Sequence, residues 1–325
     1  PTLLERVASK MDDRLTALKE KKSFSFKEKS LMDVLATGIK FAPTIISGVD
    51  DAKHVLRTPE RFFDFNAYKQ ADVVIKSALK LISDAYSPSI LTLSTFESGT
   101  RAEESTQRAT EVTRNGDVNP FIDLYEKVLL PSESWQNYGL VGISIVGISQ
   151  ILPGLTLARL LKEKYPHLHI TLGGPIFSVN TKQLIGRPEF FQEFCHSIVT
   201  FEGEEPLHRL LTTLKKGSTL KDVPNLLFCE DGKVELNEER VELRFEELPS
   251  PTFDGLSMDL YLSPYPILPV LQSRGCYWGK CTFCTHSFIY GHRYGKQRTE
   301  QMVNELESLA EKYKTKYFTF SDEAV

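Results

Sequence analysis

The sequence predicts an α/β protein, with a helical N-terminal cap, a doubly wound parallel sheet and the beginning of a second α/β unit. Three observations lead to this prediction. Apolar positions recur at helical spacing up to residue 86, short apolar runs alternate with amphipathic stretches over residues 87–215, and an apolar run at 267–271 leads into a group of cysteines. Alternation of strands and helices is typical of a parallel sheet wound by helices.

The chain divides into four predicted segments. Residues 1–86 are expected to be mostly helical, 87–215 to form a Rossmann-like domain, 216–266 to form a hairpin and a proline-rich linker, and 267–325 to begin the last unit. In the second segment the expected strands are 89–94, 139–145, 169–175 and 197–205, and the expected helices are 119–130, 152–165, 180–194 and 206–217. Asn119 and Pro120 are expected to begin the first of these helices, and Asp231-Gly232 to turn the hairpin.

The composition is that of an ordinary globular protein. A chain of 325 residues with 41% hydrophobic and 25% charged residues is long enough for two or three domains. The formal net charge of −4 argues against a nucleic-acid partner, and no apolar stretch is expected to span a membrane. No signal peptide opens the sequence, so reduced cysteines and a cytoplasmic location are expected.

Three of the five cysteines lie within nine residues, with the spacing C-x4-C-x2-C. Three thiolates, from Cys276, Cys281 and Cys284, can hold three irons of a [4Fe-4S] cluster and leave the fourth iron open. A zinc site completed by His286 is the alternative, although four ligands within eleven residues close a tetrahedron poorly. Cys195 and Cys229 stand alone in apolar surroundings and are expected to be core residues.

At these cysteines the chain resembles the cluster loop of the radical S-adenosylmethionine (radical SAM) superfamily. The common pattern there is C-x3-C-x2-C with an aromatic residue before the last cysteine, so the first gap here is one residue longer. The resemblance implies that the three cysteines hold a [4Fe-4S] cluster and that SAM binds its open iron. It also implies that Phe283 lies beside the adenine of SAM.

Glycine turns follow three predicted strands, at the edge where open α/β sheets bind ligands. Taken singly, each turn is more simply a strand-to-helix connection. The phrases that carry them, LVGISIVGISQ, ITLGGP and VTFEGEEP, resemble the cobalamin-binding domain that precedes the barrel in one branch of the superfamily. That resemblance implies a cobalamin site with these residues: Ser144, Val146, Gly147, Ile148, Gly173, Gly174, Pro175, Glu202, Gly203 and Glu204.

A cobalt-ligating histidine is not expected. The motif Asp-x-His-x-x-Gly, whose histidine ligates cobalt in many cobalamin domains, does not occur in the sequence. His167, His169, His196 and His208 are expected to be surface or packing residues. Cobalamin is therefore implied by the domain and not by a ligating side chain.

The last segment predicts a helix at 299–313 and a strand at 317–323 that ends in two acids. By resemblance these elements are the first step of a (β/α) barrel, and Asp322 or Glu323 meets the amino group of SAM. The alternative is that both are ordinary solvated acids. A barrel needs more βα units than remain before Val325, and the chain starts at Pro1, so it is expected to be a portion of a longer protein.

The resemblance implies a cobalamin-dependent radical SAM enzyme. Its expected activity is methyl transfer to an unactivated carbon of a peptide or other natural-product precursor, through a 5′-deoxyadenosyl radical. The peptide-modifying members resemble it most in the phrases SPSILTLS and NPFIDLYEKVLL. A flavodoxin or ferredoxin is the expected electron donor. The alternatives are a cobalamin-containing radical SAM enzyme that catalyses a rearrangement, and a non-enzymatic module that binds a corrinoid or zinc.

Overall fold

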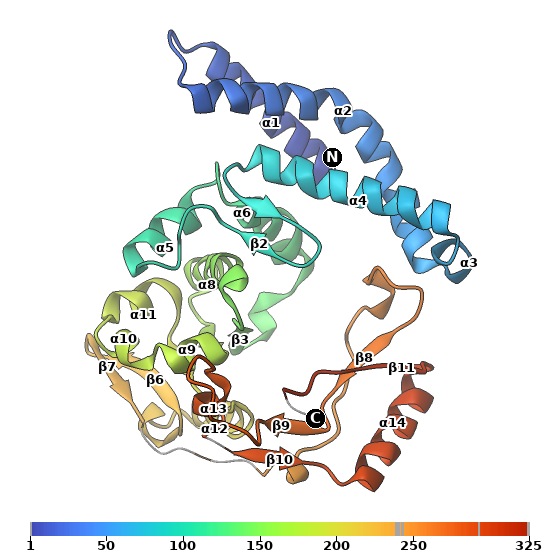
Figure 1. The fold of residues 1–325 in the computed structure, drawn as a ribbon. Coiled ribbons are helices and arrows are strands. Elements are labelled where there is room, and N and C mark those ends of the chain that lie inside the picture. The colour runs from blue at the N-terminus through green and yellow to red at the C-terminus, as the bar shows by residue number, and fades with distance from the viewer. Residues whose placement is uncertain (1, 238–240, 242–243, 292, 324–325) are drawn as a thin grey trace. The chain divides into compact units, whose positions relative to one another are not determined.

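The computed structural model describes residues 2–237, 241, 244–291 and 293–323, which fall into two compact units. The first unit comprises Pro1–Ser134, Ser149–Leu157 and Leu262–Pro264, and the second comprises Trp135–Ile148, Ala158–Tyr261 and Tyr265–Val325. Figure 1 shows the elements of both units in chain order.

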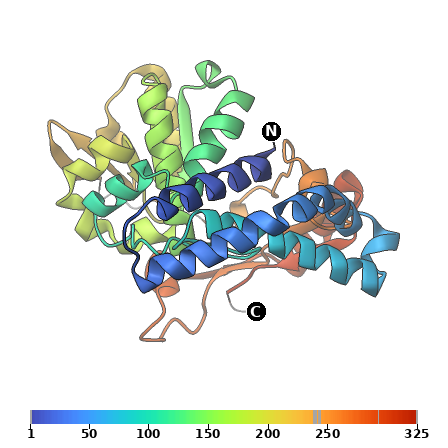
Figure 2. The same cartoon turned by 90° about the horizontal axis from the view of Figure 1, so that it is seen from above.

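The first unit begins with long helices that pack side by side (Figures 1 and 2). They are α1 (Leu3–Lys19), α2 (Phe26–Arg57), the short α3 (Pro59–Phe62) and α4 (Phe65–Ala85). Capping boxes begin α1 and α2, because Thr2 pairs with Glu5 and Ser25 with Glu28. Buried side chains of α1, α2 and α4 share one core, centred on Met11 and Leu35, which are both fully buried. The helical N-terminal region is therefore as predicted.

Helix α2 is the only described helix that is long and apolar enough to cross a membrane, by length and composition alone. This differs from the sequence-based expectation that no stretch approaches that length. One face of α2 packs into the cores shared with α1 and α4, through residues such as Leu35, Ala42 and Val55. A core helix of a globular protein passes the same test.

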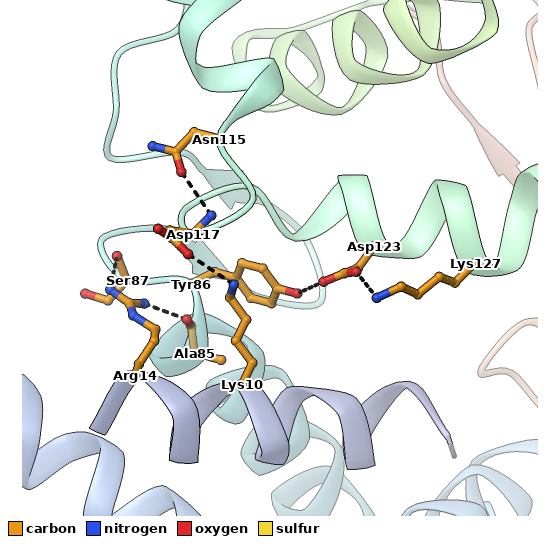
Figure 3. A network of polar contacts seen from close by, with 9 residues as sticks. All are labelled: Lys10, Arg14, Ala85, Tyr86, Ser87, Asn115, Asp117, Asp123 and Lys127. Atoms are coloured by element: carbon orange, nitrogen blue, oxygen red, sulfur yellow. Dashed lines mark hydrogen bonds and ion pairs between the residues drawn. The ribbon is translucent and has the colours of Figure 1, made fainter. Parts of the chain in front are cut away.

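A polar network fastens α1 to the end of α4 and to α6 (Pro120–Leu124) (Figure 3). The buried hydroxyl of Tyr86 donates to Asp123 Oδ2 at 2.9 Å, and Lys127 also pairs with Asp123. Lys10 lies over the Tyr86 ring, 4.9 Å from its centroid. Arg14 donates to the carbonyl oxygen of Ala85 at 2.6 Å. The network supplies hydrogen-bond partners to polar groups that the packing of these helices buries.

The predicted strand at 89–94 does not join the main sheet. Its residues form β1 (Ile90–Leu91), which pairs antiparallel with β2 (Phe96–Glu97) in a separate two-stranded sheet. The hydroxyl of Thr92 accepts hydrogen bonds from the amides of Ser94 and Thr95, so the chain turns after two paired residues. Helix α5 (Thr106–Arg114) follows.

The helix predicted at 119–130 forms with its predicted start. Asn119 caps it by accepting from the amide of Phe121, and Pro120 occupies its first turn. It is not uniform, because α6 continues into a π-helical segment (Tyr125–Leu129) and ends in α7 (Leu130–Ser132).

The second unit contains a five-stranded sheet with the order β3-β4-β5-β6-β7. Its strands are β3 (Leu140–Ser144), β4 (His169–Gly173), β5 (Ser197–Val199), β6 (Leu226–Glu230) and β7 (Lys233–Leu236). The first three strands are parallel to one another, while β6 and β7 join antiparallel as the hairpin predicted around Asp231-Gly232. Asp231 and Gly232 both have positive φ (51° and 76°), which suits a type I′ turn.

Helices connect the parallel strands of this sheet. They are α8 (Ile151–Lys164), α9 (Pro175–Val179), α10 (Thr181–Ile185), α11 (Pro188–Phe194) and α12 (Glu204–Lys216). The single helix predicted at 180–194 is broken in two, because Pro188 begins a new helix and cannot continue the previous one. Leu210 of α12 packs against Val199 and Phe228 of the sheet.

The last segment forms one parallel strand–helix–strand step. β8 (Ile267–Val270) pairs parallel with β11 (Tyr317–Phe320), and α14 (Thr299–Tyr313) connects them and buries Met302 and Leu309 against Leu268 and Val270. Between β8 and α14, β9 (Ser273–Gly275) pairs antiparallel with β10 (Tyr294–Lys296), and the cysteine loop and α13 (His286–Ile289) lie between these two strands. The step agrees with the predicted beginning of a (β/α) unit.

The Tyr86 network generates a stability prediction. Replacing Tyr86 with Phe leaves the Asp123 carboxylate without its buried donor, so the free energy of unfolding should fall by about 1 kcal/mol. Tyr125→Phe is the matched control, because no hydrogen bond to the Tyr125 hydroxyl occurs among the described contacts. Equal effects of both substitutions in denaturant unfolding would show that the Tyr86 hydrogen bond contributes nothing.

Candidate functional site

A cavity of about 450 Å³ lies at the carboxyl ends of β3, β4 and β5. Parallel strands end at one edge of a sheet, and ligands of α/β proteins bind at that edge. The cavity is lined mostly by glycines and apolar side chains, with few polar groups. Its lining residues are Gly142, Ile143, Ser144, Thr171, Leu172, Gly173, Gly174, Val199, Phe201, Gly203, Glu204 and Leu207.

Half of the residues predicted for a cobalamin site line this cavity: Ser144, Gly173, Gly174, Gly203 and Glu204. Val146 and Ile148 lie on the loop after β3, and their side chains are 59% and 68% exposed. Pro175 begins α9, and Glu202 is turned toward two arginines. Sequence reasoning missed Thr171, Phe201 and Leu207, because nothing in their local pattern distinguishes them from ordinary strand and helix residues.

Gly174 and Gly203 differ in whether the backbone requires a glycine. Gly174 has a φ of 113°, and a Cβ there would lie 2.3 Å from the carbonyl oxygen of Ile145. Its freedom is therefore used for a close approach of two backbone segments. Gly203 has an ordinary negative φ of −99°. A Cβ added there would have Val199 Cγ1, at 3.8 Å, as its nearest neighbour. A side chain at Gly203 is sterically allowed and can probe the cavity.

The Glu202 carboxylate forms ion pairs with Arg274 of β9 and with Arg293, which directly precedes β10. Its oxygens lie 2.7 Å from Arg293 Nη2 and 3.4 Å from Arg274 Nη1. Arg274 Nη1 also lies 2.8 Å from Glu204 Oε1. Burial lowers the pKa of Arg274, but the two carboxylates outweigh burial and raise it. The arginines are a second set of residues that sequence reasoning missed, although Arg274 stands only two positions before Cys276.

The three clustered cysteines lie on one loop and are free thiols. Cys276 and Cys284 are partly exposed and Cys281 is exposed, and the amide of Cys284 donates to the carbonyl oxygen of Cys281 at 3.3 Å. Among the described residues, no three His, Cys, Asp or Glu side chains lie close enough together to hold a metal ion. Three unpaired thiols on one accessible loop nevertheless form a donor set that suits an iron–sulfur cluster.

The two acids at the end of β11 have different partners. Asp322 accepts hydrogen bonds from the Ser273 amide at 2.5 Å and from the Ser273 hydroxyl at 2.6 Å, and so it fastens the turn between β8 and β9. Glu323 accepts from the amide of Gly275 at 3.3 Å and lies 3.6 Å from Nδ1 of His286. Both acids are therefore engaged by groups around the cysteine loop, and Glu323 is the one bound to Gly275, the residue before Cys276.

Phe283, predicted to lie beside adenine, is 88% exposed. Tyr277 and Trp278 on the same loop are also exposed, at 67% and 58%. The loop therefore presents an aromatic surface next to its thiols. Aromatic rings of this kind can stack on the faces of purine bases.

His167, His169 and His196 lie away from the cavity at the strand ends. His169 and His196 contribute to a second cavity of about 780 Å³, which Gly139 and Leu140 of the β3 region also line. His169 Nε2 lies 2.8 Å from Ser197 Oγ, and His196 Nδ1 accepts from the Ile170 amide at 2.9 Å. The prediction that these two are packing residues fits these contacts, and His167 and His208 are exposed.

The two remaining cysteines belong to the sheet region. Cys195 is buried, and burial raises the pKa of its thiol. Lys162 donates hydrogen bonds to the carbonyl oxygens of Gln192 and Cys195, at 2.8 and 3.2 Å, and so caps the end of α11. Cys229 lies on β6 and is partly exposed. Cys195 is therefore the core residue that was predicted, whereas the same prediction is wrong for Cys229, which is not fully buried.

Comparison with known proteins finds three relatives in sequence. No family model matches the chain. It is 31% identical over 188 residues to an uncharacterized methyltransferase of Pyrococcus horikoshii, covering 55% of this chain and 39% of the relative. It is 26% identical over 214 residues to hopanoid C-3 methylase of Methylococcus capsulatus, covering 64% and 39%. It is 30% identical over 151 residues to 4′-phospho-dehydrooxetanocin synthase of Priestia megaterium, covering 43% and 19%.

Two solved structures are also similar. The radical SAM methyltransferase TsrM of Kitasatospora setae, with cobalamin and a [4Fe-4S] cluster bound, gives a TM-score of 0.46 at 16% identity, over 62% of this chain and 41% of that one. The cobalamin-dependent radical SAM enzyme OxsB, with aqua-cobalamin and SAM bound, gives 0.49 at 24% identity, over 62% and 27%. Because both scores are below 0.5, the fold described above rests on this chain's own strand order and register.

By name, the three sequence relatives are a methyltransferase, a methylase and a synthase. The chain spans 39% of the length of each of the first two curated relatives. The narrower likeness to peptide-modifying members stays a prediction.

The histidine pair generates a prediction about pH. Burial is the main cause that lowers the pKa of both His169 and His196 to about 4, so both stay neutral in the folded chain near pH 6. In the unfolded chain they bind protons below about pH 6.5. Between about pH 6.5 and 4 the unfolded state therefore binds more protons, and the free energy of unfolding should decrease as the pH falls.

The double substitution His169→Gln and His196→Asn should make this acid loss shallower, measured by urea unfolding at several pH values between about 4 and 7. Gln keeps a donor near the position of Nε2, and Asn keeps an acceptor near that of Nδ1. An unchanged pH slope in the double variant would contradict the assignment of these two groups.

Proposed function

We propose that the complete protein is a cobalamin-dependent radical SAM enzyme that transfers a methyl group to an unactivated carbon. The observation that carries this proposal is the pairing, within one compact unit, of a three-cysteine loop with a glycine-lined cavity at the carboxyl ends of β3, β4 and β5. The curated relatives include a methyltransferase and a methylase, which supports methyl transfer.

In this proposal the thiolates of Cys276, Cys281 and Cys284 hold a [4Fe-4S] cluster. When the groups are bound, the cluster and SAM supply a 5′-deoxyadenosyl radical and cobalamin supplies the methyl group. The protein's own residues position these groups. Phe283 offers an aromatic face to adenine, and Glu323, which accepts from the amide of Gly275 directly before Cys276, is the acid assigned to the amino group of SAM.

The cavity at the strand ends is assigned to the corrinoid. Gly173, Gly203 and Ser144 allow a flat macrocycle to approach the sheet edge, because they place little side-chain volume there. Leu207 and Phe201 add apolar surface that excludes water.

We further propose a peptide or other natural-product precursor as the substrate, a flavodoxin or ferredoxin as the electron donor, and a cytoplasmic setting in which the thiols stay reduced.

The cluster assignment predicts the effect of losing one thiol. Cys281→Ala in the full protein, reconstituted anaerobically with iron and sulfide, should lose cluster absorbance and cleave SAM at least about a hundredfold more slowly. Cys229→Ala is the matched control, because this partly exposed cysteine lies on β6 outside the loop. Iron content and SAM cleavage that survive Cys281→Ala would contradict the ligand assignment.

The corrinoid assignment predicts the effect of filling the cavity. Gly203→Leu places a side chain among the lining residues without a backbone clash, so binding of hydroxocobalamin should weaken by about tenfold or more, measured by retention on gel filtration and by absorbance titration. Gly186→Leu is the control, since nothing lies within 4 Å of a Cβ there, its φ is −88°, and the residue is outside the lining. Equal affinity in both variants would place the corrinoid elsewhere.

One observation keeps a rearrangement as the second candidate. A curated relative at 30% identity is a synthase by name and not a methylase. The two reactions differ in how SAM is consumed, because repeated methyl transfer converts a second SAM to S-adenosylhomocysteine. Formation of 5′-deoxyadenosine without S-adenosylhomocysteine during turnover would favour the rearrangement.

A further inference from the structure

The side chain of Glu202 is only 8% exposed and pairs with two arginines that flank the cysteine loop in the β9–β10 ladder. Arg274 lies on β9, opposite Gly295 of β10, and Arg293 comes directly before β10. Arg274 also lies over the Phe245 ring, 5.4 Å from its centroid, which limits where its guanidinium can move. The ladder therefore meets the turn after β5 through a buried carboxylate.

The arginine ladder is joined tightly to the first cysteine. Gly275, which precedes Cys276, has a φ of 83°, and a Cβ there would lie 2.1 Å from the carbonyl oxygen of Arg293. The Gly275 backbone is thus pressed against the backbone of Arg293. Any displacement of Arg293 moves the backbone at which the cysteine loop begins.

Glu202 is joined equally closely to the cavity at the strand ends. Its neighbours Phe201 and Gly203 line that cavity, and Glu204 lines it as well while pairing with Arg274. Phe201 has a strained backbone with a φ of 60°. Its amide donates a hydrogen bond to Ser178 Oγ at 2.7 Å, which holds the backbone in this conformation. The turn that carries Glu202 is therefore a fixed point on the cavity wall.

We propose that Glu202 is a positioning residue that sets the placement of the strand-end cavity relative to the cysteine loop. This inference rests on the proposed function, because the two places matter together only if one holds a corrinoid and the other a cluster. A buried carboxylate shared by two guanidinium groups has few alternative partners, so it holds one arrangement. A loss of this pairing should change the relative placement without removing either binding site.

The experiment is Glu202→Gln in the full protein, loaded anaerobically with iron, sulfide and hydroxocobalamin. The readout is the electron spin relaxation of cob(II)alamin in the presence of the reduced cluster, which depends steeply on the distance between the two paramagnets. The variant should keep wild-type cluster and corrinoid contents but lose most of the relaxation enhancement. Its turnover should fall by one to two orders of magnitude, the scale expected when reacting groups are misplaced by about 1 Å.

Glu205→Gln is the matched control, because Glu205 is the neighbouring acid on α12 and pairs with Arg209 of the same helix at 2.7 Å. Wild-type relaxation in Glu202→Gln would overturn the inference alone. Wild-type protein that holds no cluster or no corrinoid would overturn the proposed function and the inference with it.

If Glu202→Gln does not fold, two variants that keep the charges, Glu202→Asp and Arg293→Lys, replace it. Both should give intermediate relaxation, and wild-type relaxation in both would overturn the inference.

Discussion

The second unit depends on one buried carboxylate, that of Glu202. Its partners Arg274 and Arg293 belong to the ladder that carries the cysteine loop, while its sequence neighbours line the cavity at the strand ends. A carboxylate that is 8% exposed is stable only when it is paired, so neither the turn after β5 nor the ladder can shift independently without a cost in free energy. The ion pairs of Glu202 therefore connect the strand-end cavity with the cysteine loop, in addition to the covalent connection along the chain.

The sequence could predict the elements whose periodicity is strong. The helix at 299–313 follows from apolar spacing, and the parallel pairing of 267–270 with 317–320 agrees with the barrel step that the resemblance implied. The Asp231-Gly232 turn followed from backbone chemistry, because these residues tolerate positive φ. Likewise the cap at Asn119 depends on neighbours in the chain and needs no tertiary information.

Other features depend on contacts between residues far apart in the sequence. Residues 89–94 have an apolar pattern that fits a sheet strand, but the Thr92 hydroxyl turns the chain and β1 pairs with β2 instead. Gly174 was predicted as a ligand-contacting glycine and does line the cavity, but its positive φ also serves a close approach to Ile145 that the sequence does not reveal. Glu202 and Glu204 looked equivalent in sequence, yet only Glu204 lines the cavity while Glu202 faces the arginines. Local patterns cannot separate such roles, because tertiary packing decides which way each side chain points.

In the proposed enzyme the cysteine loop holds an iron–sulfur cluster while the sheet domain of the same unit holds a corrinoid. The most direct test is the metal content of the full protein purified anaerobically from its native host, by elemental analysis for iron, cobalt and zinc. We expect about four irons and one cobalt per chain, with no stoichiometric zinc. One zinc per chain without iron or cobalt would contradict it and would assign the three cysteines to a structural metal site.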